Sequence, residues 1–148
     1  MAWAHMAAPS GRDVERVIEW TCTKIGKEAL FGIAPMDVDI DSPGFYCAEP
    51  LFDLPPSAAA AYLGTFLLSL VDSLEDQKGV DHFITRPHTL AFLKDRKSWD
   101  KVIRKNLPKN CQEVLADVIL FFVAKRDELA QTDEGVEILL ELAQSLRQ

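Results

Sequence analysis

Three aspartates at alternating positions, Asp37, Asp39 and Asp41, form the pattern in the sequence that is closest to a metal site. A calcium loop of the EF-hand type carries acidic ligands at its first, third and fifth positions. Such a loop also requires glycine at the sixth position and glutamate at the twelfth, where this chain has Ser42 and Ala48. We therefore interpret the three aspartates as an acidic, solvated loop and expect no bound metal.

Two histidines, His82 and His88, are the next candidates for metal binding. Zinc proteases place two histidines four residues apart on one helix face, in the pattern H-E-x-x-H. The histidines of this chain are six residues apart, and Pro87 separates them structurally. We expect them to be polar surface residues or to make a contact at the start of a helix.

The sequence lacks the motifs of nucleophilic catalysis and of phosphate binding. It contains no G-x-S-x-G turn and no C-x-x-C pair, and its seven glycines are scattered singly. Cys22, Cys47 and Cys111 are widely separated and odd in number, which is typical of reduced thiols in a cytoplasmic or nuclear protein. The sequence thus predicts a protein that is not an enzyme and that uses no cofactor.

The uneven distribution of charge is the most informative feature of the sequence. The chain of 148 residues has a formal net charge of −7, yet residues 86–109 contain eight basic and only two acidic residues. This segment carries +6 and the rest of the chain −13. On a short helix over residues 99–107, the basic side chains would lie opposite Trp99, Val102 and Ile103. The basic candidates for partner binding are Arg86, Lys97, Lys101, Arg104 and Lys105.

The elements that position these residues are predicted to be helices. A composition of 48% hydrophobic and 26% charged residues is typical of one soluble globular domain. Apolar residues recur at helical spacing between capping residues, glycines and prolines. We predict helices over residues 11–31, 58–76, 85–95, 99–107, 111–129 and 133–146, the last three capped by Ser98, Asn110 and Thr132. This pattern predicts an all-α fold, either a bundle of five or six helices or a short array of armadillo- or HEAT-like hairpins.

Residues 32–56, between the first two predicted helices, differ from the rest of the chain. They contain five of the eight prolines, and the segment is longer than an ordinary connection between helices. It is also too apolar for a free linker, so we expect an ordered proline-rich strap around the helical core. The apolar anchors for a partner, if they are exposed, would be Phe45, Tyr46 and Phe52.

The first residues of the chain are expected to lie outside its folded domain. His5-Met6 is a dipeptide that a common cloning site encodes, so we expect residues 1–9 to be disordered or introduced by cloning, and residues 10–148 to form one domain.

Residues 58–71, the most apolar stretch of the sequence, are too short for a membrane span, which needs about 20 residues. We therefore expect a buried helix there and no contact with a membrane.

These observations predict a non-catalytic helical domain, an adaptor or scaffold that binds a protein or peptide. One alternative is a small acidic inhibitor or immunity protein that neutralises a toxin enzyme. Another is a nucleic-acid accessory factor that uses residues 86–109, although the net charge disfavours nucleic acid. The basic residues could also be an ordinary solvated helix face. A further expectation is self-association through the last helix, whose apolar face is wide: Val136, Ile138, Leu139, Leu140 and Leu142.

Overall fold

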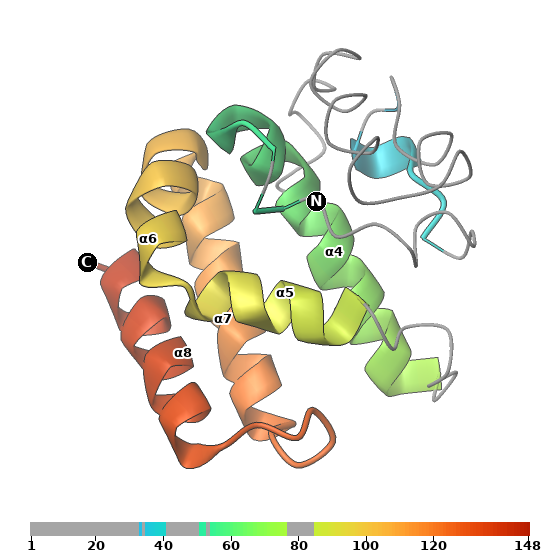
Figure 1. Ribbon diagram of the computed structural model, residues 1–148, viewed down its shortest axis with the longest axis vertical. Coiled ribbons are helices and arrows are strands. Elements are labelled where there is room, and N and C mark those ends of the chain that lie inside the picture. The colour runs from blue at the N-terminus through green and yellow to red at the C-terminus, as the bar shows by residue number, and fades with distance from the viewer. Residues whose placement is uncertain (1–32, 34, 41–50, 53, 77–84) are drawn as a thin grey trace.

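The computed structural model describes residues 33, 35–40, 51, 52, 54–76 and 85–148. These residues form helices, turns and connecting segments with no strand among them, so the predicted all-α class is confirmed for this part of the chain. Figure 1 shows how the helices are arranged. The predicted first helix and the candidates Phe45 and Tyr46 lie outside the described residues.

Helix α4 (Pro56–Asp76) is the central helix of the structure. Pro56 occupies its first position, where a fixed φ angle and a missing N–H suit a helix start. Buried side chains lie on almost every side of it, among them the fully buried Tyr62, Phe66 and Leu70. By length and composition alone, Pro56–Leu74 could also cross a membrane, but most of this stretch is buried inside the protein. The sequence prediction of a buried core helix is confirmed.

A turn of 3₁₀-helix, η2 (Pro35–Asp37), packs against α4 from the segment that precedes it in the chain. The Tyr62 hydroxyl donates a hydrogen bond to the Ile33 carbonyl at 3.1 Å, and the Thr65 hydroxyl donates to the Pro35 carbonyl at 3.0 Å. Both bonds pair a side chain of the central helix with a backbone carbonyl of the preceding segment. They fasten the backbone on either side of residue 34 to the central helix.

Helix α5 (Thr85–Lys94) packs on α4 and α8, and the chain then continues through α6 (Arg96–Ser98) into the π-helical segment η3 (Trp99–Arg104). Asp95 is the N-cap of α6, and its side chain accepts hydrogen bonds from the Lys97 N–H at 3.3 Å and the Ser98 hydroxyl at 2.7 Å. The prediction that Ser98 caps this helix is therefore wrong. Ser98 already has helical backbone angles, and its hydroxyl donates to the cap instead of serving as one.

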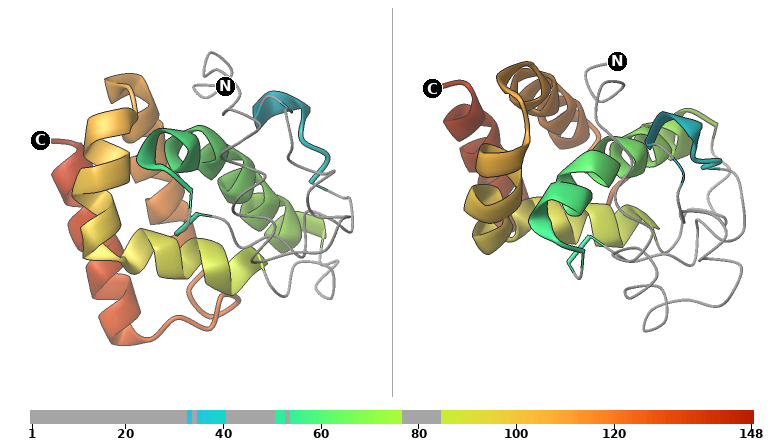
Figure 2. Two further views of the ribbon diagram at one scale, coloured as in Figure 1. Left: turned by 45° about the horizontal axis from the view of Figure 1, so that its top comes forward. Right: turned by 90° about the horizontal axis from the view of Figure 1, so that it is seen from above.

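Helices α7 (Lys109–Ala124) and α8 (Asp133–Leu146) form an antiparallel hairpin, which is visible in Figure 1 and in the left view of Figure 2. The predicted cap of α8 is confirmed, because the Thr132 hydroxyl accepts a hydrogen bond from the Gly135 N–H at 3.1 Å. The predicted cap of α7 is wrong. Helix α7 begins at Lys109, directly after Pro108, and Asn110 lies inside its first turn.

Helix α7 ends earlier than its apolar pattern predicted. The helix stops at Ala124, and Leu129 is buried from the following turn and not from the helix itself. The turn includes Ala130 at a φ of 52°, a left-handed conformation that no α-helix can continue through. The helical spacing of apolar residues continues past the end of the helix because the turn also faces the core.

The wide apolar face of α8 is largely used within the chain. Val136, Leu139 and Leu142 are buried, and Ile138 and Leu140 are half-buried. Helix α8 packs against both α7 and α5, which together cover it. Packing inside the protein therefore accounts for the feature that suggested self-association through this helix.

Candidate protein-interaction surface

The charged side chains of residues 96–105 fall into two adjacent rows. The inner row consists of Arg96, Asp100 and Arg104, and the outer row, which we call the lysine row, consists of Lys97, Lys101 and Lys105. Residues within a row are four positions apart. A π-helix holds more residues per turn than the 3.6 of an α-helix, so the π-helical segment η3 keeps residues at this spacing close to one line.

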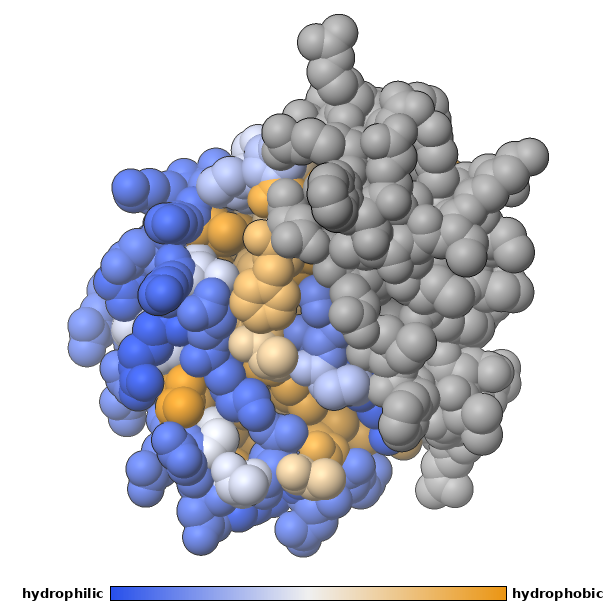
Figure 3. Space-filling model, in the orientation of Figure 1, coloured by the Kyte–Doolittle hydropathy of each residue, from blue (hydrophilic) through white to orange (hydrophobic). Residues whose placement is uncertain are grey.

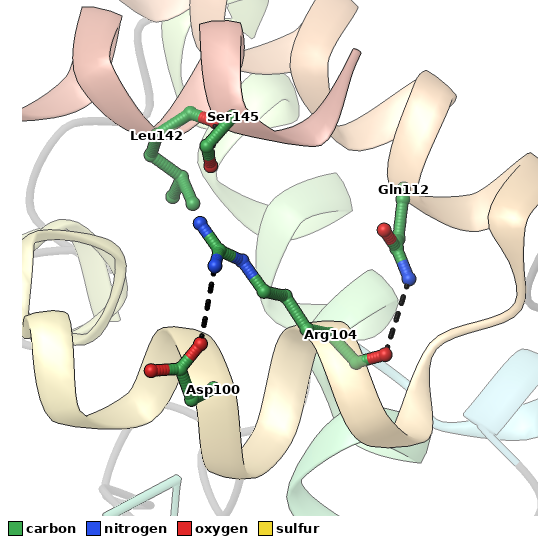
Figure 4. A network of polar contacts seen from close by, with 5 residues as sticks. All are labelled: Asp100, Arg104, Gln112, Leu142 and Ser145. Carbon is green, nitrogen blue, oxygen red and sulfur yellow. Dashed lines mark hydrogen bonds and ion pairs between the residues drawn. The ribbon is translucent and has the colours of Figure 1, made fainter. Parts of the chain in front are cut away.

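The inner row is neutralised within the protein. Arg96 forms an ion pair of 2.7 Å with Glu141 of α8, and Arg104 forms one of 3.2 Å with Asp100. The hydrogen bond between Arg96 and Glu141 lowers the pKa of the Glu141 carboxyl and raises the pKa of Arg96. Figure 4 shows the Arg104 guanidinium pointing towards α8, near Leu142. The inner row thus faces α8.

The lysine row is exposed and has no such partners. Among the described residues, no ion pair or hydrogen bond involves the ammonium group of Lys97, Lys101 or Lys105. On the opposite side of the same segment, Trp99 and Ile103 are buried, and the Trp99 indole N–H donates to the Leu93 carbonyl at 2.7 Å. The three ammonium groups therefore project from a backbone that is firmly packed. Figure 3 shows that the surface over α6 and α8 is mainly hydrophilic.

The other basic residues of the segment 86–109 form hydrogen bonds with other groups of the chain. Arg86 donates to Ser73 twice, from Nε to the hydroxyl and from Nη2 to the carbonyl, both at 2.6 Å. Lys94 donates to the Gln131 side chain at 2.9 Å, and Lys109 donates to the Leu146 carbonyl at 2.8 Å. With the two arginines of the inner row, five of the eight basic residues have a partner within the described chain. The lysine row is what remains.

The structure thus separates the basic residues that the sequence had grouped as candidates. Lys97, Lys101, Arg104 and Lys105 lie on one continuous segment, whereas Arg86 is half-buried at the other end of α5. Asp100 precedes Arg104 by four residues, a spacing that already indicates an ion pair on a helix. The pairing of Arg96 with Glu141 spans 45 positions, and no local pattern could have indicated it.

Phe52 is the one aromatic candidate that the structure describes. It is 49% exposed, and its ring meets His88 and Phe92 edge-on, with ring centroids 5.7 Å and 5.4 Å apart. One side of Phe52 is therefore fixed against α5 while the other remains available. Apolar surface of this kind gathers towards the middle of the face drawn in Figure 3.

His88 is buried, so the first of its two expected roles, a polar surface residue, is wrong, whereas the second, a contact at the start of a helix, agrees with its place near the start of α5. Its imidazole packs edge-on against Phe52 and Phe66, and its Nε2 accepts a hydrogen bond from the Leu51 N–H at 3.3 Å. Burial lowers the pKa of His88 to about 4, because the charged form would lose its hydration. His88 is therefore a neutral acceptor at neutral pH, a structural role that its spacing from His82 could not indicate.

The described residues hold no cluster of three or more histidine, cysteine or acidic side chains that could bind a metal ion. Asp37 and Asp39 are exposed, as expected for a solvated loop, while Asp41 and His82 lie outside the described residues. Cys111 is fully buried in α7, and burial raises the pKa of its thiol. Such a thiol is a packing group and a poor nucleophile.

Comparison of the chain with protein-family models, with curated proteins and with solved structures finds no match. The function proposed below therefore depends on the chemistry of the surface alone.

Proposed function

We propose that this protein is a non-catalytic, all-α interaction domain, an adaptor or scaffold, and that the lysine row is the surface that binds its protein or peptide partner. The observation that supports this most directly is the selective pairing of charges. Five of the eight basic residues of the segment 86–109 are engaged by groups of the chain, while three adjacent lysines are left exposed. Like charges four residues apart on a helix destabilise it slightly. An acidic partner would relieve that repulsion.

A protein partner explains this surface better than a nucleic acid does. Proteins that bind single strands stack bases on exposed aromatic rings beside the basic groups. Here Trp99 is only 5% exposed, and the Arg96 guanidinium lies 5.7 Å from the centre of its ring. The net charge of −7 also opposes a general attraction to nucleic acid. The alternative of an inhibitor that acts through aspartates of the strap depends on four residues, of which Asp37 and Asp39 are exposed and Asp41 and Asp53 lie outside the described residues.

We further propose that the helices form one bundle and not an array of hairpins. In an array each unit contacts only its neighbours along the chain. Helix α5 packs on α4, which precedes it, and also on α8, the last helix. This long-range contact supports a closed bundle around a single core.

The predicted strap over residues 32–56 is supported by the parts of it that are described. Val38, Leu51 and Leu54 are buried, and the carbonyls of Ile33 and Pro35 accept hydrogen bonds from α4.

The free, buried thiol of Cys111 supports a cytoplasmic or nuclear location, because thiols stay reduced there.

The test compares two variants that remove the same amount of charge. One carries Lys97→Gln, Lys101→Gln and Lys105→Gln, and the control carries Lys125→Gln, Arg126→Gln and Arg147→Gln. Of the control residues, Lys125 and Arg126 are half-buried and Arg147 is exposed, and they are paired with Glu128, Asp133 and Asp117. Both variants and the wild type are used to capture partners from native lysate, after thermal melting has shown that each is folded.

We expect the wild type and the control to retain one stoichiometric protein partner and the lysine-row variant to lose it. Retention of the same partner by the lysine-row variant would refute the proposed surface. Recovery of nucleic acid alone would refute the proposed class of partner.

A further inference from the structure

We propose that the lysine row recognises a contiguous run of aspartates and glutamates in an extended segment of its partner. This inference rests on the proposed function and names the chemistry of the ligand. The exposed side chains and spacing of Lys97, Lys101 and Lys105 carry it, together with the separate use that the chain makes of its arginines.

The choice of side chain indicates what kind of carboxylate is recognised. Arginine presents a rigid planar fork that fits one carboxylate in a defined orientation, whereas lysine offers a flexible point charge. Both arginines of the segment 96–105 are held by carboxylates of the chain, Arg96 by Glu141 and Arg104 by Asp100. Only lysines are left for a partner. Such a surface suits carboxylates that can adjust their positions, as those of an unfolded acidic run can.

The spacing of the row fits an extended peptide. Successive lysines are four residues apart along a segment that is mostly π-helical, so they follow one another at up to about 6 Å, the rise of four α-helical residues. Side chains on one face of an extended strand repeat every second residue, at about 6.6–6.8 Å. Because lysine side chains are long and flexible, three carboxylates on alternate residues of the partner can lie opposite Lys97, Lys101 and Lys105. Runs of like charge repel one another and stay extended, so an acidic run holds this conformation without folding.

The charge pattern around the row also favours a short acidic segment over a large acidic surface. The protein outside residues 86–109 carries −13, so a broad anionic partner would be repelled wherever it extended beyond the row. A narrow segment that lies along the row meets the three ammonium groups and little else. The paired inner row beside it separates the lysines from Glu141.

The experiment uses the full chain and fluorescein-labelled peptides, with fluorescence anisotropy as the readout. One peptide contains a run of about six glutamates, and a second of equal length and charge separates neighbouring glutamates by two glycine or serine residues, so that its carboxylates no longer fall on alternate residues of one face. Binding is measured at ionic strengths of roughly 0.01 M and 0.15 M, because exposed charge pairs are screened over this range. The two triple-glutamine variants described above serve as the test and the control.

We expect the contiguous peptide to bind the wild type and the control variant alike, and the lysine-row variant at least about tenfold more weakly. We also expect binding to weaken at the higher ionic strength and the separated peptide to bind more weakly than the contiguous one. Equal binding of the contiguous peptide to the lysine-row variant overturns the inference, and so does tighter binding of an oligothymidylate of similar charge. Self-association of the chain that the lysine-row variant abolishes would also overturn it, because the acidic ligand would then be a second copy.

The two proposals can fail separately. If the lysine-row variant loses its captured partner while the contiguous peptide fails to bind the wild type, the proposed function stands and the acidic run is refuted. If the variant keeps its partner, the proposed surface itself is refuted.

Discussion

The backbone N–H of Leu51 donates a hydrogen bond of 3.3 Å to Nε2 of His88, which joins two residues 37 positions apart in the chain. Leu51 is buried in the segment that leads into α4, and His88 lies in the first half of α5. The imidazole also packs edge-on between Phe52 and Phe66. A single neutral histidine therefore holds the segment before α4 against α5, and only the unprotonated nitrogen can accept the bond.

This contact predicts a loss of stability in mild acid. Burial lowers the pKa of His88 from its usual 6.5 to about 4 in the folded protein. Between these two pH values the unfolded chain binds a proton that the folded protein does not, so the free energy of unfolding falls as the pH drops. The contribution of neutral His88 to the free energy of unfolding totals about 3 kcal/mol. It is complete above pH 6.5 and is lost progressively towards pH 4.

Chemical denaturation across this pH range checks the prediction. The control is His88→Gln, whose side-chain oxygen can still accept from the Leu51 N–H but does not titrate. The wild type should lose more stability than the variant between neutral pH and about pH 4.5, and the carboxyl groups common to both cancel in the comparison. Parallel curves for the two proteins would contradict the role given to His88.

A second prediction concerns Arg86, which joins the end of α4 to the start of α5. Its guanidinium makes two hydrogen bonds of 2.6 Å to the hydroxyl and the carbonyl of Ser73. Lysine cannot reproduce this two-pronged contact, so Arg86→Lys should lower the free energy of unfolding by about 1–3 kcal/mol.

The matched control is Arg96→Lys, which alters a largely exposed ion pair with Glu141 and should lower the free energy of unfolding much less than Arg86→Lys does. Urea denaturation of the purified proteins measures the change in the free energy of unfolding for both substitutions. Equal effects of the two substitutions would contradict the structural role of Arg86 and would return it to the candidates for partner binding.

Local sequence signals predicted the elements whose ends depend on neighbouring residues. The alanine- and leucine-rich run after Pro56 indicated α4, and Thr132 indicated the start of α8. The errors arose where a contact distant in the sequence, or a competing neighbour, decided the outcome. Asp95 displaced Ser98 as a cap because a carboxylate accepts both available donors. Leu129 continued the apolar period of α7 although a turn, and not the helix, brings it into the core.

The candidate surface was visible in the sequence only as a concentration of positive charge. Sequence spacing placed Lys97, Lys101, Arg104 and Lys105 on one side of a helix, and the structure shows all four exposed there. The distinction between a neutralised and an unneutralised row depends on Glu141, a residue of another helix. Tertiary contacts of this kind leave no local pattern, which is why the lysine row could be recognised only in the folded protein.

Lysine footprinting of the captured complex tests the proposed surface most directly. An acylating reagent is applied to the free protein and to the complex, and mass spectrometry measures the labelling of each lysine. If the lysine row is the contact, labelling of Lys97, Lys101 and Lys105 falls severalfold in the complex, while that of Lys125, beyond the far end of α7, stays unchanged. Undiminished labelling of all three lysines in an intact complex would contradict the account.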